Sequence, residues 1–331
     1  MHWFTFSPND FSVAFLSVLF EGVPFLLLGS LISGFVDVFV SSERLAKMLP
    51  KSPSAAIVLS GLLGIIFPMC ECGSVVVIRR FIRKGLPLSC AVTYMLSAPI
   101  VSPIVALSTV TAFRGNRPWE MMSLRLGIGY LIAIAAGFIV QRLRASDIVQ
   151  PGLLPEAGAP KRRGGLQVAA APSTATGDPR DFSEIALGAS IPRKIILSIQ
   201  SATADFLDVA FFFIVGTSIA SLFNTAVNQQ LILPFATQPF LAIIVLMVLA
   251  AIVALCSTTD AFVAASFATF PRSAKLAFLL FGPVFDLKLF WLYGLLFKRR
   301  FVILLPMCLF IVIAFICYQI ASVLDYVPHL P

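Results

Sequence analysis

The chain has 331 residues, of which 59% are hydrophobic and 12% charged, and its mean hydropathy is +0.96. Soluble domains are roughly half apolar and a quarter charged, so this composition excludes an ordinary soluble domain and indicates a protein dissolved in lipid. The net charge of +8 does not indicate nucleic-acid binding, because the basic residues are dispersed between apolar segments and no zinc-finger or RNP-like motif is present.

In chain order, the predicted apolar segments are 11–40, 55–78, 86–113, 123–141, 205–223, 239–257, 276–297 and 301–323. Each is at or near the about 20 residues that a helix needs to cross a bilayer. Residues 142–194 are rich in Pro, Gly, Ala and Ser and are predicted to be a flexible linker. The predicted fold is an all-α polytopic membrane protein. It has a first transmembrane repeat at 1–141, the linker, and a second repeat at 195–331, each with about four hydrophobic segments.

The two halves share a sequence pattern. When Cys72 is aligned with Cys256, Pro99 falls on Pro283 without a gap. Internal repeats of this kind recur in transporters, whose broken helices meet near the middle of the membrane. We therefore expect broken or re-entrant helices at that depth in both halves.

Basic residues predict the topology. If 55–84 and 239–271 dip into the membrane and return, the linker side carries eighteen Lys and Arg residues and the opposite side five. If all eight segments cross, the numbers are fourteen and nine. The positive-inside rule favours the first arrangement, which makes the repeats inverted and the central loop cytoplasmic. The eight-crossing arrangement is the alternative.

The first candidate site is Pro68-Met69-Cys70-Glu71-Cys72-Gly73. Pro68 and Gly73 predict a helix break. A charge exposed to lipid is costly, so Glu71 is expected to face a cavity lined by protein or water. Cys70 and Cys72 could bind a soft metal or metalloid, with the alternative that they are small packing residues. The basic residues that follow are expected to reach the lipid headgroups: Arg79, Arg80, Arg83 and Lys84.

The second candidate site is Cys256-Ser257-Thr258-Thr259-Asp260, at the corresponding place in the second half. Cys256 is the third candidate thiol ligand, and Ser257 and Thr258 are candidate substrate contacts. Asp260 is either an ion- or proton-coupling group or the cap of a connecting loop.

The third candidate site pairs the segment containing Pro99 and Ser102 with the segment containing Pro283, Asp286 and Lys288. Pro99, Ser102 and Pro283 mark predicted helix breaks and are candidate substrate contacts. Asp286 and Lys288 are candidates for ion or proton coupling, as Glu71 is. Glu71 is also the candidate partner of Lys288, because both are charges inside apolar segments. Glu21 and Asp208 form a further acidic pair, which either joins the halves or lines the path.

The segments 67–105 and 256–294 resemble the two signature blocks of the bacterial predicted permeases, a family that includes the ArsP-type organoarsenical exporters and many uncharacterised members. The motifs Cys-Glu-Cys-Gly and Gly-Pro-x-x-Asp-x-Lys are more similar to the uncharacterised branch than to the arsenical exporters. The resemblance implies a multi-spanning permease of the cytoplasmic membrane, with trivalent arsenic held by Cys70 and Cys72, together with Cys256. Ser102 departs from the Asn that the family often has at that position.

No P-loop or hydrolase motif is present, so neither an enzyme nor ATP-driven transport is indicated, and no cofactor is expected. The expected function is an inner-membrane secondary permease that exports a small solute such as a trivalent organoarsenical or another thiol-binding metalloid. The alternatives are a membrane subunit of a larger complex and a membrane thiol redox protein. The expected partners are the lipid bilayer, the solute, and a second copy of the chain or a small accessory protein.

Overall fold

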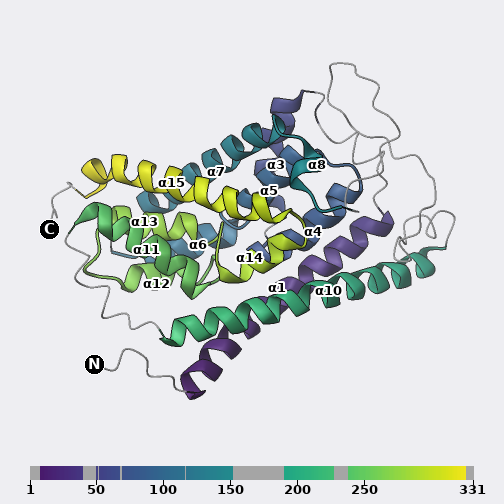
Figure 1. Ribbon diagram of the computed structural model, residues 1–331, viewed down its shortest axis with the longest axis horizontal. Helices are drawn as coiled ribbons and strands as arrows, with labels where there is room; N and C mark the ends of the chain where they lie inside the picture. Colours follow the sequence, from purple (N-terminus) through teal and green to yellow (C-terminus); the bar gives the residue numbers. More distant parts are fainter. Residues whose placement is uncertain are drawn as a thin grey trace.

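Figure 1 shows the computed structural model, in which helices form nearly all of the regular structure. The structure describes residues 8–39, 50, 52–67, 69–115, 117–151, 190–226 and 238–325. Pro68 and linker residues 152–189 lie outside this part of the chain. Four described helices are long and apolar enough to cross a membrane: α1 (Pro8–Phe39), α7 (Pro118–Gln141), α10 (Ile191–Ala226) and α15 (Arg299–Leu324).

Helices α1 and α10 lie side by side along one edge of the molecule (Figure 1). Small residues allow their backbones to approach closely, as in many membrane helix pairs. A Cβ added at Gly34 of α1 would lie 2.3 Å from the Ser198 carbonyl oxygen of α10. These two helices therefore pack as a pair that joins the first half of the chain to the second.

The other helices in the described part of the chain are shorter. They are α3 (Pro53–Ile66), α4 (Glu71–Arg83), α5 (Leu88–Ser97), α6 (Pro103–Ala112), α8 (Ala145–Ile148), α11 (Pro239–Val253), α12 (Asp260–Ser266), α13 (Arg272–Phe281) and α14 (Leu287–Gly294). The predicted segments 55–78, 86–113 and 276–297 are therefore not continuous helices. The first of them is interrupted between Ile66, where α3 ends, and Glu71, where α4 begins, and the other two at 98–102 and 282–286, while residues 254–259 separate α11 from α12. The expected helix breaks are present at all four places.

Local chemistry accounts for where the helices resume. Pro103 is suited to the first turn of α6, because its missing N–H would have no partner there. Asp286 caps α14 by accepting a hydrogen bond from Leu289 N at 2.7 Å. At the end of α11, Ala254 adopts a left-handed conformation with φ 52°, which turns the chain out of the helix.

Helix α5 is almost wholly buried and packs against α7, α3 and α4. Gly137 of α7 makes the closest approach, since a Cβ there would lie 1.9 Å from Thr93 Oγ1. Helix α13 occupies a similar interior position, against α11 and α15. The breaks at 98–102 and 282–286 follow directly after these two buried helices.

The beginning of the predicted linker is held against the connection between α14 and α15. Lys298 N donates to Ile148 O at 2.7 Å, and Gln150 N donates to Leu296 O at 3.0 Å. Val149 and Phe297 form an isolated antiparallel bridge between them. These two connections therefore lie at the same end of the molecule.

Candidate functional site

A small cavity lies where three of the helix breaks meet. Its volume is about 20 Å³, enough for one water molecule. Five of the residues predicted as site residues line it, although they come from both halves of the chain. The full lining is Phe25, Met69, Cys70, Ser102, Ile104, Val105, Cys256, Ser257 and Thr258.

Two lining side chains also cap helices. Cys70 precedes α4, and its Sγ accepts a hydrogen bond from Gly73 N at 3.3 Å. Ser102 precedes α6, and its Oγ accepts one from Ile104 N at 3.3 Å. The N-terminal ends of α4 and α6 therefore lie at the cavity. The partial positive charge of a helix N-terminus favours anions and electron-rich ligands.

Gly73 has a packing role in the structure. A Cβ added at Gly29 of α1 would lie 2.9 Å from the Gly73 Cα, and one at Gly73 would lie 3.1 Å from Phe25 O. The two glycines thus allow α4 to lie directly against α1. Pro99 and Pro283 occur at the predicted breaks, but neither is part of the cavity lining.

The expected pair of Glu71 and Lys288 is confirmed. Lys288 Nζ lies 2.9 Å from Glu71 Oε1 and 3.3 Å from Asp286 Oδ2, and all three side chains are buried. Lys288 also donates to the carbonyl oxygens of Ala254 and Leu255 at 3.0 and 3.3 Å. One cation therefore binds two carboxylates and the carboxyl end of α11.

Asp286 and Lys288 meet because the backbone is broken at Asp286. Residues two apart do not face each other on a regular helix. Asp286 stands before α14 in an extended conformation, whereas Lys288 lies in its first turn. The side chains can therefore converge on the ion pair.

Asp260 pairs with Arg125, a residue that was not predicted as part of the site. Arg125 Nη2 lies 2.9 and 2.8 Å from the two carboxylate oxygens and donates to Ser257 O at 2.8 Å. Its Nη1 donates to Thr109 Oγ1 at 2.9 Å. Arg125 is 0% exposed, so this pair joins α7 to α12 in the interior.

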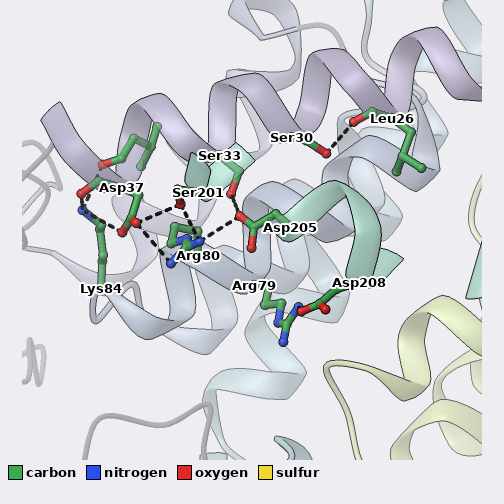
Figure 2. A network of polar contacts seen from close by, with 11 residues as sticks. Leu26, Ser30, Ser33, Asp37, Arg79, Arg80, Lys84, Ser201, Asp205 and Asp208 are labelled. Atoms are coloured by element: carbon green, nitrogen blue, oxygen red, sulfur yellow. Dashed lines mark hydrogen bonds and ion pairs between the residues drawn. The ribbon is translucent and has the colours of Figure 1, made fainter. Parts of the chain in front are cut away.

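A second polar network joins α4 to α1 and α10 (Figure 2). Arg80 lies 2.9 Å from Asp205 and 3.3 Å from Asp37, and it donates to Ser201 Oγ. Lys84 lies 3.8 Å from Asp37 Oδ1 and donates to the Asp37 carbonyl oxygen at 2.6 Å. Among the described residues, the ion pairs of this network join Arg80 and Lys84 to Asp37 and Asp205.

This network corrects the prediction that Arg80 and Lys84 reach the lipid headgroups. Both are buried, because the acids on α1 and α10 give them partners inside the protein. Arg79 is partly exposed and pairs with Asp208 at 3.2 Å. The sequence signal that was missed is the presence of Asp37, Arg125 and Asp205 within apolar segments.

Glu21 and Asp208 each contact the opposite half of the chain. Glu21 Oε1 of α1 accepts a hydrogen bond from Thr259 Oγ1 and lies 3.4 Å from Thr258 Oγ1. Asp208 of α10 accepts from Arg79 of α4. Of the two earlier interpretations, joining the halves fits these contacts. Glu21 also lies close to the cavity, because its neighbour Thr258 is one of the residues that line the cavity.

All six cysteines are free thiols, and only Cys308 is exposed. Cys70 and Cys72 lie close enough for their side chains to interact, and Cys256 is near both Cys70 and Glu71. In the part of the chain that the structure describes, no group of three or more His, Cys, Asp or Glu side chains has an arrangement that could hold a metal ion. A trithiolate site would therefore need a movement of the helix breaks.

The apolar helices and the ion pairs between them define a multi-pass membrane protein with a charged interior. Residues 9–323 match the family model described as "Predicted permease", of ArsP type, and the chain belongs to that family. This confirms the resemblance seen in the two signature blocks.

Two curated proteins are similar to the chain. It is 33% identical to "UPF0718 protein YcgR" of Bacillus subtilis (strain 168) over 293 residues, which cover 88% of this chain and 90% of that protein. It is 32% identical over 290 residues to a Streptococcus mutans (serotype c, strain ATCC 700610 / UA159) protein called "Putative two-component membrane permease complex subunit". That match covers 87% of each chain. No solved structure matches the sequence.

Proposed function

We propose that the chain is an inner-membrane secondary permease that exports a small solute, with a trivalent organoarsenical or another thiol-binding metalloid as its substrate. The observation that carries this proposal is the cavity at the helix breaks, where Cys70 and Cys256 from opposite halves face a shared space with three hydroxyl-bearing residues. Thiolates are the preferred protein ligands of soft metals and metalloids. Cys72, beside Cys70, supplies a third sulfur when the breaks move.

Contacts between the segments that link the membrane helices support the topology in which 55–84 and 239–271 are re-entrant. In that arrangement 142–194 and 298–300 share one side, as do 41–54 and 79–84, whereas the eight-crossing arrangement separates both pairs. Lys298 N bonds Ile148 O, at the beginning of the linker. Lys84 bonds the carbonyl oxygens of Val36 and Asp37, in the last turn of α1.

The opposite side of the membrane supplies a third contact of the same kind. Arg272 lies 3.1 Å from Glu120, so 272–275 and 114–125 lie together. The re-entrant arrangement places both on one side, and the eight-crossing arrangement does not. With the excess of Lys and Arg on the linker side, these contacts favour a cytoplasmic linker.

The order of the helices supports an inverted repeat. Each half begins with a long helix, α1 or α10, and ends with another, α7 or α15. Between them, the described part of each half has two pairs of short helices, and a break separates the two helices of each pair. Two such halves with three crossings each would have opposite orientations, as in many secondary transporters.

The charged groups of the site are proposed to couple transport to an ion or proton gradient. Asp260, Asp286 and Lys288 are buried. Asp260 and Lys288 belong to ion pairs that connect the two halves, and Asp286 pairs with Lys288 within the second half. Relative motion of the halves would make or break these pairs. Such an arrangement links occupancy of the site to the side on which it is open.

A second candidate function is that of one subunit in a larger permease complex. It is favoured by the name of the Streptococcus mutans relative, which describes a two-component membrane permease complex. In that case a small accessory membrane protein, or a second copy of the chain, would complete the transport path. Reconstitution of the purified chain in liposomes separates the two functions, because a subunit alone would move no solute.

The decisive experiment measures accumulation of trivalent methylarsenical in cells stripped of their arsenic exporters. We expect lower accumulation with the wild-type chain, and loss of the effect in a Cys70→Ser, Cys72→Ser double variant at equal membrane levels. Cys90→Ser is the matched control, because Cys90 is buried in a separate small cluster with Ala56 and Ile57. Equal accumulation in wild-type and empty-vector cells would remove arsenicals as the substrate.

A further inference from the structure

We infer that two buried clusters of ion pairs, one on each side of the cavity, are the gates that open it alternately to the two sides of the membrane. The inference rests on the proposed function and adds the route by which a solute reaches the site. The linker-side gate is Arg80 with Asp37 and Asp205, and the opposite gate is Arg125 with Asp260.

The linker-side gate lies between the cavity and the end of the molecule at which the linker begins. Cys70 lines the cavity and precedes α4, and Arg80 lies about 15 Å further along that helix. Lys84, one turn beyond Arg80, bonds the Asp37 carbonyl oxygen in the last turn of α1. Figure 2 shows Arg80 between Asp37 and Asp205. Helix α4 thus carries a cavity residue at one end and the gate at the other.

The opposite gate lies on the other side of the cavity. Ser257 lines the cavity, and Arg125 Nη2 donates to its carbonyl oxygen at 2.8 Å as well as to Asp260. Arg125 Nη1 donates to Thr109 Oγ1 at 2.9 Å, one turn beyond the lining residue Val105. Arg125 lies about 24 Å from the end of α7 that leads into the linker. Figure 1 accordingly shows α12 toward one end of the molecule, and α4 and α8 toward the other.

Each gate joins the first half of the chain to the second. Arg80 of α4 pairs with Asp205 of α10, and Arg125 of α7 pairs with Asp260 of α12. These four residues are at most 7% exposed, and the cavity between the two gates has a volume of about 20 Å³. That volume holds one water molecule, so a larger solute needs one of the gates to separate.

Ion pairs suit this role because water decides between their two conditions. In a dry interior, separating the partners leaves each charge uncompensated, which is strongly unfavourable. Once water enters between the halves, each charge is hydrated and the pair contributes little. A gate of this kind is therefore either dry and paired or wet and separated. Two such gates around a fixed site permit the alternating access of secondary transporters.

Hydroxyl groups extend the polar surface of the linker-side gate. Ser33 Oγ of α1 donates to Asp205 Oδ2 at 2.6 Å. Ser201 Oγ of α10 donates to Asp37 Oδ2 at 3.0 Å and accepts from Arg80 Nη2 at 2.9 Å. The surfaces that α1, α4 and α10 turn toward one another are therefore ones that water can wet when they separate.

The test is the reaction of a cavity thiol with an anionic, membrane-impermeant methanethiosulfonate reagent in vesicles of either orientation. Cys256 is the reporter, with all other cysteines replaced by alanine, and a tag inserted in the linker identifies its side. Arg80→Gln with Asp205→Asn leaves Lys84 paired with Asp37 and should speed labelling about ten-fold or more, from the linker side only.

Arg125→Gln with Asp260→Asn should produce the same acceleration from the opposite side only. Cys70 as the sole thiol should report the same sidedness from the other half of the chain. Cys90 as the sole thiol is the matched control, because it lies in a separate small cluster, and its labelling should not change.

Arg80→Lys and Arg125→Lys keep every charge and decide the matter if the double variants do not fold. Lysine lacks the fork with which arginine binds several groups at once, so each should speed labelling from its own side by about two- to five-fold. Equal acceleration from both sides, or none in any variant, would overturn the gates.

Methylarsenical counterflow, measured in chains that keep all their cysteines, reports the proposed function separately. Sided labelling without counterflow removes the substrate and keeps the gates. Counterflow without sided labelling removes the gates and keeps the permease.

Discussion

Arg125 Nη2 binds both carboxylate oxygens of Asp260, although 135 residues separate Arg125 from Asp260 in the chain. Arg125 lies inside α7, and Asp260 is the first residue of α12. The pair therefore ties the last long helix of the first half to a short helix of the second half. The pair joins one cation to one carboxylate, whereas Lys288 faces the two carboxylates of Glu71 and Asp286.

Removing one member of this pair should be strongly destabilising. Arg125→Met leaves the Asp260 carboxylate buried without a partner, and we expect a loss of about 3–5 kcal/mol in the free energy of unfolding. Combining Arg125→Met with Asp260→Asn should recover a large part of the loss, because no charge is then left unpaired. Unfolding in mixed micelles at increasing dodecyl sulfate measures both. A double variant no more stable than Arg125→Met would contradict this account.

Two glycines of α7 provide a matched comparison of helix packing. Gly137→Ala places a Cβ 1.9 Å from Thr93 Oγ1, so α5 and α7 must separate, and we expect a loss of about 1–3 kcal/mol. Gly127→Ala meets no atom within 4 Å and should raise stability slightly, because alanine favours the helix. The same unfolding assay ranks the two variants. Equal effects would show that α5 and α7 pack less closely than the structure indicates.

The acids of α10 should differ in importance according to their burial. Asp205→Asn removes a buried partner of Arg80 and should cost about 3–5 kcal/mol. Asp208→Asn affects a pair whose side chains are 18% and 32% exposed, and its cost should be about 0–1 kcal/mol. Thermal unfolding of the two variants in one detergent provides the measurement. The reverse order would mean that Arg80 is hydrated in the folded protein.

The end of α11 stores local strain that a single substitution can relieve. Ala254 has φ 52°, a conformation that costs a residue with a Cβ about 1–2 kcal/mol and glycine almost nothing. Ala254→Gly should therefore raise the unfolding midpoint while keeping the carbonyl oxygen that accepts from Lys288. Ala250→Gly, inside the same helix, should lower the midpoint, because it should cost about 0.5–1 kcal/mol in the free energy of unfolding. If both variants lower the midpoint, the left-handed turn is not present in solution.

The helix breaks could be predicted because prolines, glycines and cap residues act locally. Pro103 and the capping side chain of Asp286 stand at the positions where helices resume. The pairing of Glu71 with Lys288 could also be predicted, since a charge in an apolar segment needs a partner and few were available. The family followed from the same two blocks of sequence.

The remaining ion pairs could not be predicted in the same way. Arg80 was expected near the lipid headgroups because the helix from Cys72 to the basic residues that begin at Arg79 spans about 10 Å. Its partners Asp37 and Asp205 instead come from two other helices. Partner choice there depends on how α1 and α10 pack around α4, which periodicity does not specify. The division of the chain into 1–141, 142–194 and 195–331 stays a prediction, because most of the linker is outside the described residues.

Ion pairs that connect the two halves also affect how the protein is made. Glu71 is synthesised 217 residues before Lys288, and Arg125 135 residues before Asp260. At a translation rate of about 5–20 residues per second, Glu71 precedes its partner by roughly 10–40 s. During that interval the nascent first half carries charges that only the insertion machinery or water can solvate. We therefore expect the first helices to be released into lipid only after the second half is made, and a chain truncated at the linker to be degraded by membrane proteases.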